Sequence, residues 1–194
     1  VKARYMATDY PESLKGHFLM AMPGLMDPNF HQTVICLSEH TRDGAVGIVI
    51  NRAHPSLKAA AIFSELQIVH HDEVGQVPVY LGGPVHASEV FILHGLPFDA
   101  DVSLEITPHL AMSTTRDVLE QIALGKGPKQ YVISLGCAGW GPGQLEAEIR
   151  QNAWLTCQID TGIMFDTAVD KRWERAMREL GIDPALLIDA VGHA

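Results

Sequence analysis

The chain has 194 residues, of which 47% are hydrophobic and 19% charged, and its formal net charge at pH 7 is −9. These values are typical of a folded protein with one sizeable core or at most two small ones. The acidic balance and the lack of a basic run argue against a protein that binds duplex nucleic acid, which must neutralise phosphates. They also argue against association with anionic membranes.

Cysteine usage and hydropathy indicate where the protein works. Cys36, Cys137 and Cys157 are odd in number and lie far apart in apolar stretches, which predicts reduced, mostly buried thiols and no disulfide framework. The first residues lack the apolar core of a signal peptide, and no apolar run approaches membrane-spanning length. We therefore expect a cytoplasmic protein.

The first half of the chain consists mainly of short apolar stretches separated by turn residues. Residues 1–13 are polar and are expected to form a loosely held arm. Ser56 can cap a short helix over 57–66. The apolar and β-branched stretches predict strands over 18–22, 33–38, 45–51, 77–81, 90–94 and 102–106, and the Asp43-Gly44 turn predicts that the second and third form a hairpin.

In the second half of the chain, apolar residues recur at helical spacing. Ser113 or Thr114 can cap a helix that ends before Gly125, and a strongly amphipathic helix is predicted over 167–180. Between them we expect a strand over 131–135, a glycine-rich loop over 136–143 and a helix that begins near Pro142, followed by a short strand over 156–160.

This order of elements predicts an α+β fold, in which helices pack on a mostly antiparallel sheet. The strand–helix–strand passage from 131 to 160 could be locally parallel. No internal repeat or linker interrupts the chain, so we expect a single domain over residues 1–194.

The glycine-rich loop is the main candidate for a binding site. Glycines let a backbone approach a ligand without a Cβ clash, and free N–H groups at the start of the following helix attract anions. The ends of two other predicted strands, at Asn51-Arg52 and at Gly82-Gly83, could lie nearby. The candidate binding residues are Gly139, Trp140, Gly141 and Gly143, with Asn51, Arg52, Gly82 and Gly83 as possible neighbours.

Each of these features also has a structural interpretation. The glycine spacing fits neither the dinucleotide-binding pattern nor the P-loop pattern. It is also typical of a tight strand-to-helix corner in which Trp140 packs as a plug, and such corners outnumber ligand loops. Arg52 could pair with Glu39 of the neighbouring strand, and Glu146 could simply favour the helix dipole.

A second hypothesis is nucleophilic catalysis by Cys137. This cysteine follows a strand and precedes a helix, where a thiolate would be stabilised, and a histidine from elsewhere could act as its base. Leu135 stands where a nucleophile elbow needs glycine. The alternative is that Cys137 is a small buried hydrophobic residue.

The ten histidines do not show metal-binding spacing. The chain has no H-E-x-x-H and no C-x-x-C, His70 and His71 are adjacent, and Pro28 interrupts any helical pair of Asp27 with His31. We therefore expect neither a metal nor another cofactor.

Several longer motifs, in order along nearly the whole chain, resemble the AlgH/YqgE family of bacterial proteins. They are GHFLMAMP (16–23), MDPNF (26–30), EH (39–40), GA (44–45), VINR (49–52), LGGPV (81–85), AGWGPGQLE (138–146), NAWL (152–155) and GHA (192–194). This family usually has an aromatic residue such as Tyr where the chain has Cys137, which weakens the case for a family-wide cysteine nucleophile.

The resemblance implies an α+β fold in which a branched sheet curls into a barrel-like core. It implies no established catalytic residues. Members of the family are mostly uncharacterised, and some are described as transcriptional regulators because one was linked to alginate regulation. The present chain has no helix-turn-helix pattern and no basic face, so it fits that description poorly.

Residues and resemblance together predict a non-enzymatic binding or regulatory module for a small anionic ligand or a protein partner. A cysteine-dependent hydrolase and a transcriptional regulator are the alternatives. We expect neither direct nucleic-acid binding nor a membrane role.

Overall fold

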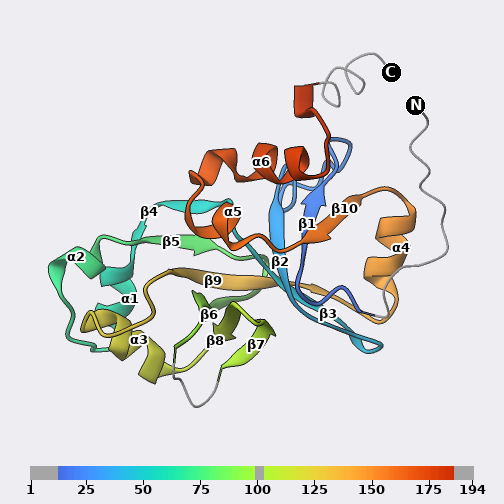
Figure 1. Ribbon diagram of the computed structural model, residues 1–194. Helices are drawn as coiled ribbons and strands as arrows, with labels where there is room; N and C mark the ends of the chain where they lie inside the picture. The colour runs from blue at the N-terminus through green and yellow to red at the C-terminus, as the bar shows by residue number, and fades with distance from the viewer. Residues whose placement is uncertain (1–12, 99–102, 186–194) are drawn as a thin grey trace.

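The computed structural model describes residues 13–98 and 103–185 (Figure 1). The arm predicted over residues 1–13 therefore lies outside the described residues except for Ser13. None of the helices in the described ranges is long and apolar enough to cross a membrane.

Ten strands form one sheet in the described part of the chain. Its order is β10-β1-β2-β3-β9-β6-β8-β7, while β5 pairs with β9 and β4 pairs with β5 off this path. The strands are β1 (His17–Ala21), β2 (Val34–Thr41), β3 (Gly44–Val49), β4 (Ala53–Lys58), β5 (Pro78–Leu81), β6 (Val85–Gly95), β7 (Leu104–Thr107), β8 (Leu110–Ser113), β9 (Tyr131–Trp140) and β10 (Trp154–Gln158).

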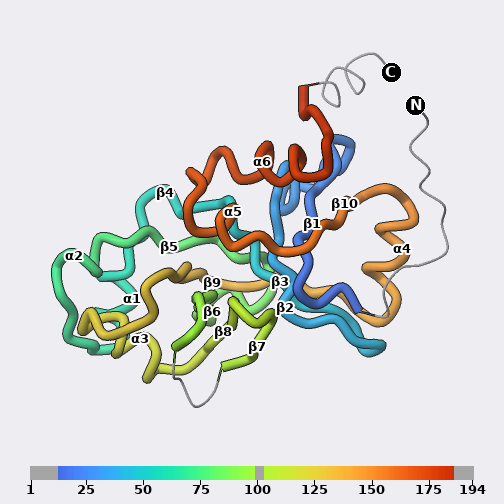
Figure 2. The backbone as a smooth tube through the Cα atoms, viewed as in Figure 1, coloured from blue at the N-terminus to red at the C-terminus, as the bar shows by residue number. Residues whose placement is uncertain are grey.

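The helices cover this sheet from three sides (Figures 1 and 2). They are α1 (Ala59–Glu65), α2 (Asp72–Gly75), α3 (Arg116–Ala123), α4 (Gln144–Arg150), α5 (Thr161–Phe165) and α6 (Arg172–Glu179), with the 3₁₀ turn η1 (Val169–Lys171) before α6. The predicted α+β class and largely antiparallel sheet are therefore confirmed, as is the hairpin of β2 and β3, in which Thr41 pairs with Gly44.

The predicted barrel-like closure is wrong. The main path of strands is open, because β10 and β7 stand at its two ends and do not pair with each other within the described residues. The sheet branches at β9 instead. The first half of β9 pairs with β5 and β6, whereas its last residues, from Ala138 to Trp140, pair with β3. The resulting divergence of strands accounts for the open shape.

The suggested parallel arrangement over residues 131–160 is also wrong. β10 pairs antiparallel with β1 and not with β9. The one parallel pair among the described strands is β5 with β9, where Tyr80 lies beside Ser134.

Alternation along the strands separates the buried side chains into three clusters. Phe18, Met20 and Ile48 face α5 and α6 on one side, and Leu19 faces the opposite side, where α4 packs. The third cluster lies under α1 and α3, around Ile92 and its neighbours. α4 and α6 therefore cover opposite faces of the β1–β2–β3 region.

Several predicted elements differ in extent. The helix predicted over 57–66 begins at Ala59, and Ser56 belongs to β4 and does not cap it. The stretch predicted as a glycine-rich loop continues as strand to Trp140. The helix predicted over 167–180 is divided into η1 and α6. β8 and α5 were not predicted, because each is short and carries no strong periodic pattern.

The branch at β9 depends on glycines at a close contact between backbones. A Cβ on Gly83 would lie 2.3 Å from the carbonyl carbon and oxygen of Cys137, and a Cβ on Gly136 would lie 2.3 Å from the carbonyl oxygen of Gly83. Both glycines also have positive φ, at +150° and +75°. A Cβ on Gly82 would lie 2.2 Å from the carbonyl oxygen of Gly136. Only glycine fits at these positions.

We expect Gly83→Ala to destabilise the fold by at least about 2 kcal/mol, because the added Cβ meets backbone that side-chain rotation cannot relieve. The measurement is the free energy of unfolding in urea. Gly24→Ala is the matched control, since nothing lies within 4 Å of its Cβ position. Equal stability of the two variants would contradict the proposed role of Gly83.

Candidate functional site

Trp140, the centre of the predicted binding loop, is a packing residue. It is 6% exposed and stacks with Phe30 at a ring-centroid distance of 6.3 Å. Its ring also meets that of Trp154 edge-on at 5.9 Å. Its indole N–H donates to Oε2 of Glu148 at 2.9 Å, and the indole N–H of Trp154 donates to the same oxygen at 2.8 Å. One carboxylate oxygen thus joins α4 to β9 and β10.

Like Trp140, the glycines around it do not form an anion site. The N–H of Gly141 donates to Oε1 of Gln144 at 3.0 Å, so the amide that would hold an anion already has a partner. Gly143 has a φ of +71° and precedes α4, which has only seven residues. Gly139 is exposed on β9. The geometry therefore favours the structural interpretation of this stretch, a tight corner between a strand and a helix.

Glu148→Ala should lower the free energy of unfolding by about 2–4 kcal/mol, because two buried indole N–H groups lose their acceptor. Circular dichroism during urea unfolding measures this change. Arg150→Ala, on the exposed side of the same helix, should stay within about 0.5 kcal/mol of the parent chain. A comparably small effect of Glu148→Ala would contradict the bridging role.

A second carboxylate of α4 holds the start of β1, a contact that sequence reasoning did not find. Nε2 of His40 lies 3.0 Å from Oε1 of Glu146, and Nδ1 of His40 accepts the N–H of Leu14 at 2.8 Å. Since a backbone N–H can only donate, Nδ1 is the acceptor and Nε2–H donates to Glu146. The two residues stand 106 positions apart, so no local pattern joins them.

The pKa of Glu146 is lowered, chiefly by a hydrogen bond from its own backbone N–H and also by His40, against the opposing effect of burial. A carboxyl with a lowered pKa in the folded state adds stability above its unfolded pKa and loses it as the pH falls through the folded pKa. Glu146→Gln should therefore reduce the loss of stability between neutral and acidic pH.

This prediction is checked by urea unfolding midpoints measured from pH 7 down to pH 3. Glu65→Gln, which changes an exposed glutamate of α1, is the control. If Glu146→Gln and its control gave the same pH dependence, the contact between Glu146 and His40 would not contribute to stability.

The Cys137 hypothesis receives no support from the geometry. The side chain is 3% exposed, and burial, followed by the nearby charge of Glu89, raises the pKa of its thiol. A nucleophilic cysteine needs the opposite shift. No histidine hydrogen-bonds its sulfur within the described ranges. Burial likewise raises the pKa of Cys157 to about 11.

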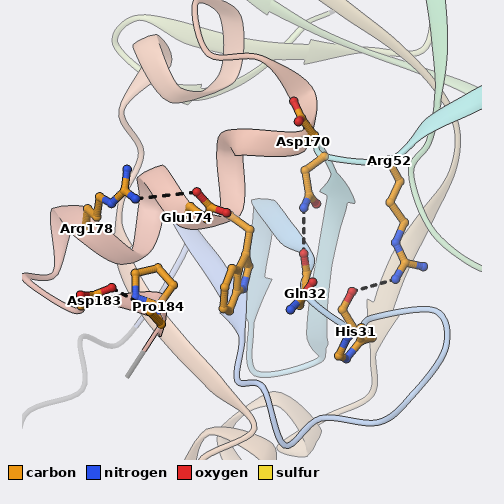
Figure 3. A pocket seen from close by; sticks show the side chains of 11 residues that line it. His31, Gln32, Arg52, Asp170, Glu174, Arg178, Asp183 and Pro184 are labelled. Atoms are coloured by element: carbon orange, nitrogen blue, oxygen red, sulfur yellow. Dashed lines mark hydrogen bonds and ion pairs between the residues drawn. The ribbon is translucent and has the colours of Figure 1, made fainter. Parts of the chain in front are cut away.

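The predicted pair Asn51 and Arg52 lies elsewhere, at a cavity of about 440 Å³ between α6 and the connection from β1 to β2 (Figure 3). The lining residues are His31, Gln32, Asn51, Arg52, Asp170, Trp173, Glu174, Arg178, Asp183, Pro184 and Ala185. Neither Trp140 nor any of the five predicted glycines lines this cavity. The structure therefore separates the eight candidate residues and brings only two of them to a cavity.

Asn51 and Arg52 fix the loop that forms one wall. Arg52 donates from Nη1 to the carbonyl of Pro28 at 2.7 Å and from Nη2 to the carbonyl of His31 at 2.8 Å. Asn51 accepts the N–H of Val34 and donates to the carbonyl of Gln32, both at 2.8 Å. The expected pairing of Arg52 with Glu39 is wrong, because these loop carbonyls take the guanidinium instead.

α6 forms the opposite wall and is firmly anchored. The indole N–H of Trp173 donates to the carbonyl of Ala21 at 3.0 Å. Arg172, which is 4% exposed, donates to the carbonyls of Thr167 and Ile50, and its guanidinium lies 5.3 Å from the ring centroid of Tyr80. The two walls are therefore both held by side chains that reach backbone carbonyls.

The charges at the cavity are mixed. Arg52 and Arg178 line the cavity together with Asp170, Glu174 and Asp183. Nη2 of Arg178 lies 3.7 Å from Oε2 of Glu174 in an exposed i,i+4 pair. No group of three or more histidine, cysteine, aspartate or glutamate side chains with the geometry of a metal site occurs among the described residues.

Comparison with known proteins places this chain in a family. The model of the AlgH-like family matches residues 18–185. The chain belongs to the AlgH-like family. The resemblance stated from the sequence motifs is thereby confirmed. A UPF0301 protein of Desulforapulum autotrophicum is 50% identical over 169 residues, which cover 87% of this chain and 89% of that protein. A UPF0301 protein of Pseudomonas fluorescens is 48% identical over 188 residues, covering 95% and 97%.

Two solved structures have the same fold. The solution structure of AlgH from Pseudomonas aeruginosa superposes with a TM-score of 0.76 at 44% identity, covering 97% of this chain and all of that one. A crystal structure of a protein from Corynebacterium diphtheriae has a TM-score of 0.71 at 22% identity, covering 94% and 93%, and shares the fold alone. The names of the UPF0301 and AlgH proteins assign no ligand or reaction.

Proposed function

We propose that this member of the AlgH-like family is a non-enzymatic binding module, whose ligand site is the cavity between α6 and the loop that Asn51 and Arg52 hold. The observation that carries the proposal is the mixed set of charged side chains around a cavity of about 440 Å³. That volume is within the usual range for small-molecule sites. The alternative of a protein partner stays a prediction.

Donors for a ligand remain on Arg52. A guanidinium carries five N–H groups, and the carbonyls of Pro28 and His31 occupy one on each Nη. The remaining N–H groups can bind a carboxylate or phosphate oxygen of the ligand. The proposed ligand therefore still carries an anionic group, as expected from the sequence.

The carboxylates narrow the ligand class further. A simple anion in the cavity would meet three carboxylates, so its attraction to Arg52 and Arg178 would be offset. A ligand with both an anionic and a cationic group satisfies both sets of charges. We therefore propose a small zwitterion, the class to which amino acids and short peptides belong.

The test is a thermal-shift and calorimetry panel of amino acids and dipeptides, with acetate, phosphate and ethylamine as singly charged probes. Zwitterions should raise the melting temperature, because a ligand that binds only the folded state stabilises it. Arg178→Gln and Glu174→Gln should each weaken binding by about tenfold, which corresponds to the loss of one charged contact.

Arg175→Gln is the matched control. Arg175 lies on the same helix and pairs with Glu179 at 2.7 Å, and it does not line the cavity. If only acetate or phosphate raised the melting temperature, the ligand would be a simple anion and not a zwitterion. A blank panel, or equal weakening in Arg175→Gln, would contradict a ligand site at α6.

A further inference from the structure

A histidine and two serines come together where β6, β7 and β8 lie side by side (Figure 1), and none of the three lines the cavity at α6. His94 of β6 is fully buried. Its Nε2 lies 3.2 Å from the hydroxyl oxygen of Ser103 and 3.1 Å from that of Ser113. The two serine hydroxyl oxygens are 2.5 Å apart.

The hydrogen-bond partners assign the proton on His94. Nδ1 lies 3.4 Å from the carbonyl oxygen of Gly95, which can only accept, so Nδ1 carries the hydrogen. Nε2 then has a free lone pair that faces the hydroxyls. Burial lowers the pKa of His94, against the smaller opposing effect of the Gly95 carbonyl, so the ring is neutral near pH 7.

One lone pair accepts only one donor, so the serines form a chain. Either Ser103 donates to Nε2 directly, or it donates to Ser113, which donates to Nε2. Ser113 is 1% exposed, whereas Ser103 is partly exposed. Ser103 is therefore the more accessible of the two serines.

A cavity lies at Phe98, a residue that contacts this cluster. It has a volume of about 510 Å³ and is lined by Leu96, Pro97, Phe98, Pro108 and His109. Phe98 connects the two features, because its ring meets that of His94 edge-on at a centroid distance of 5.4 Å. The side chains at the cavity are mostly apolar, which suits an acyl group better than a charged one.

We propose that Ser103 is an activated nucleophile that accepts an acyl group from an activated ester, with His94 as its general base. A hydroxyl hydrogen-bonded to a neutral imidazole that is oriented by a third group is the arrangement that activates serine elsewhere. This modification site goes beyond the ligand cavity at α6 and does not depend on it.

The step balances without a further reactant. The Ser103 oxygen attacks the acyl carbon of the ester while its proton passes to Nε2 of His94, directly or through Ser113. The bond between the acyl carbon and the leaving oxygen then breaks, and the proton passes from His94 to the leaving group. The products are acyl-Ser103 and the free alcohol.

The experiment treats the full chain with p-nitrophenyl acetate and locates the acetyl groups by peptide mass spectrometry. Ser103 should be acetylated about 100-fold faster than Ser64, an exposed serine of α1 in the same molecule, because general-base catalysis contributes about that factor or more. Equal rates for the two serines, or an unlabelled Ser103, would overturn the proposal.

Variants separate the roles of the three residues. Ser103→Ala should abolish the fast acetylation, and Ser113→Ala should retain it, since Ser103 still lies 3.2 Å from Nε2. His94→Gln should reduce the rate to that of Ser64. Acetylation of Ser113 in place of Ser103 would overturn the assignment. The acetylation sites located on the unaltered chain test the proposal even if the buried His94→Gln substitution prevents folding.

Discussion

The close approach of two backbones at Gly83 and Gly136 is the constraint on which the arrangement of the sheet depends. Each glycine occupies a position where a Cβ would lie 2.3 Å from the other segment's backbone. This contact lets the turn after β5 run against β9, so that β9 pairs with β5 and β6 in its first half and with β3 at its end. The sheet consequently branches and remains open, and its β1–β2–β3 part presents two faces to helices.

The two faces are held by different chemistry. On one face, a single carboxylate oxygen of Glu148 receives two indole N–H groups and fixes α4. On the other, Arg172 and Trp173 donate to backbone carbonyls and fix α6. Both oxygens of that carboxylate are engaged, because the side-chain amide of Gln144 donates to the other one. The second face leaves charged groups of α6 and Arg52 around a cavity.

The sequence was sufficient for features that depend on local patterns. The hairpin at Asp43-Gly44, the stop of α3 at Gly125 and the apolar strands were predictable because turn chemistry and alternation act over a few residues. The eight candidate site residues were chosen on a loop pattern, and tertiary contacts decided their roles. Glycines that permit backbone contact and glycines that cradle a ligand are indistinguishable in sequence. The pairing of His40 with Glu146, and the cluster of His94 with Ser103 and Ser113, join distant segments and required the structure.

The placement of the three tryptophans means that the chain carries its own optical reporters. Trp140 and Trp154 share one carboxylate on the α4 face, whereas Trp173 lies on the wall of the α6 cavity. Indole emission depends on the polarity of its surroundings. Because only Trp173 lines the cavity, a ligand bound there would change the emission of one tryptophan of the three, and this change could be followed without an added dye.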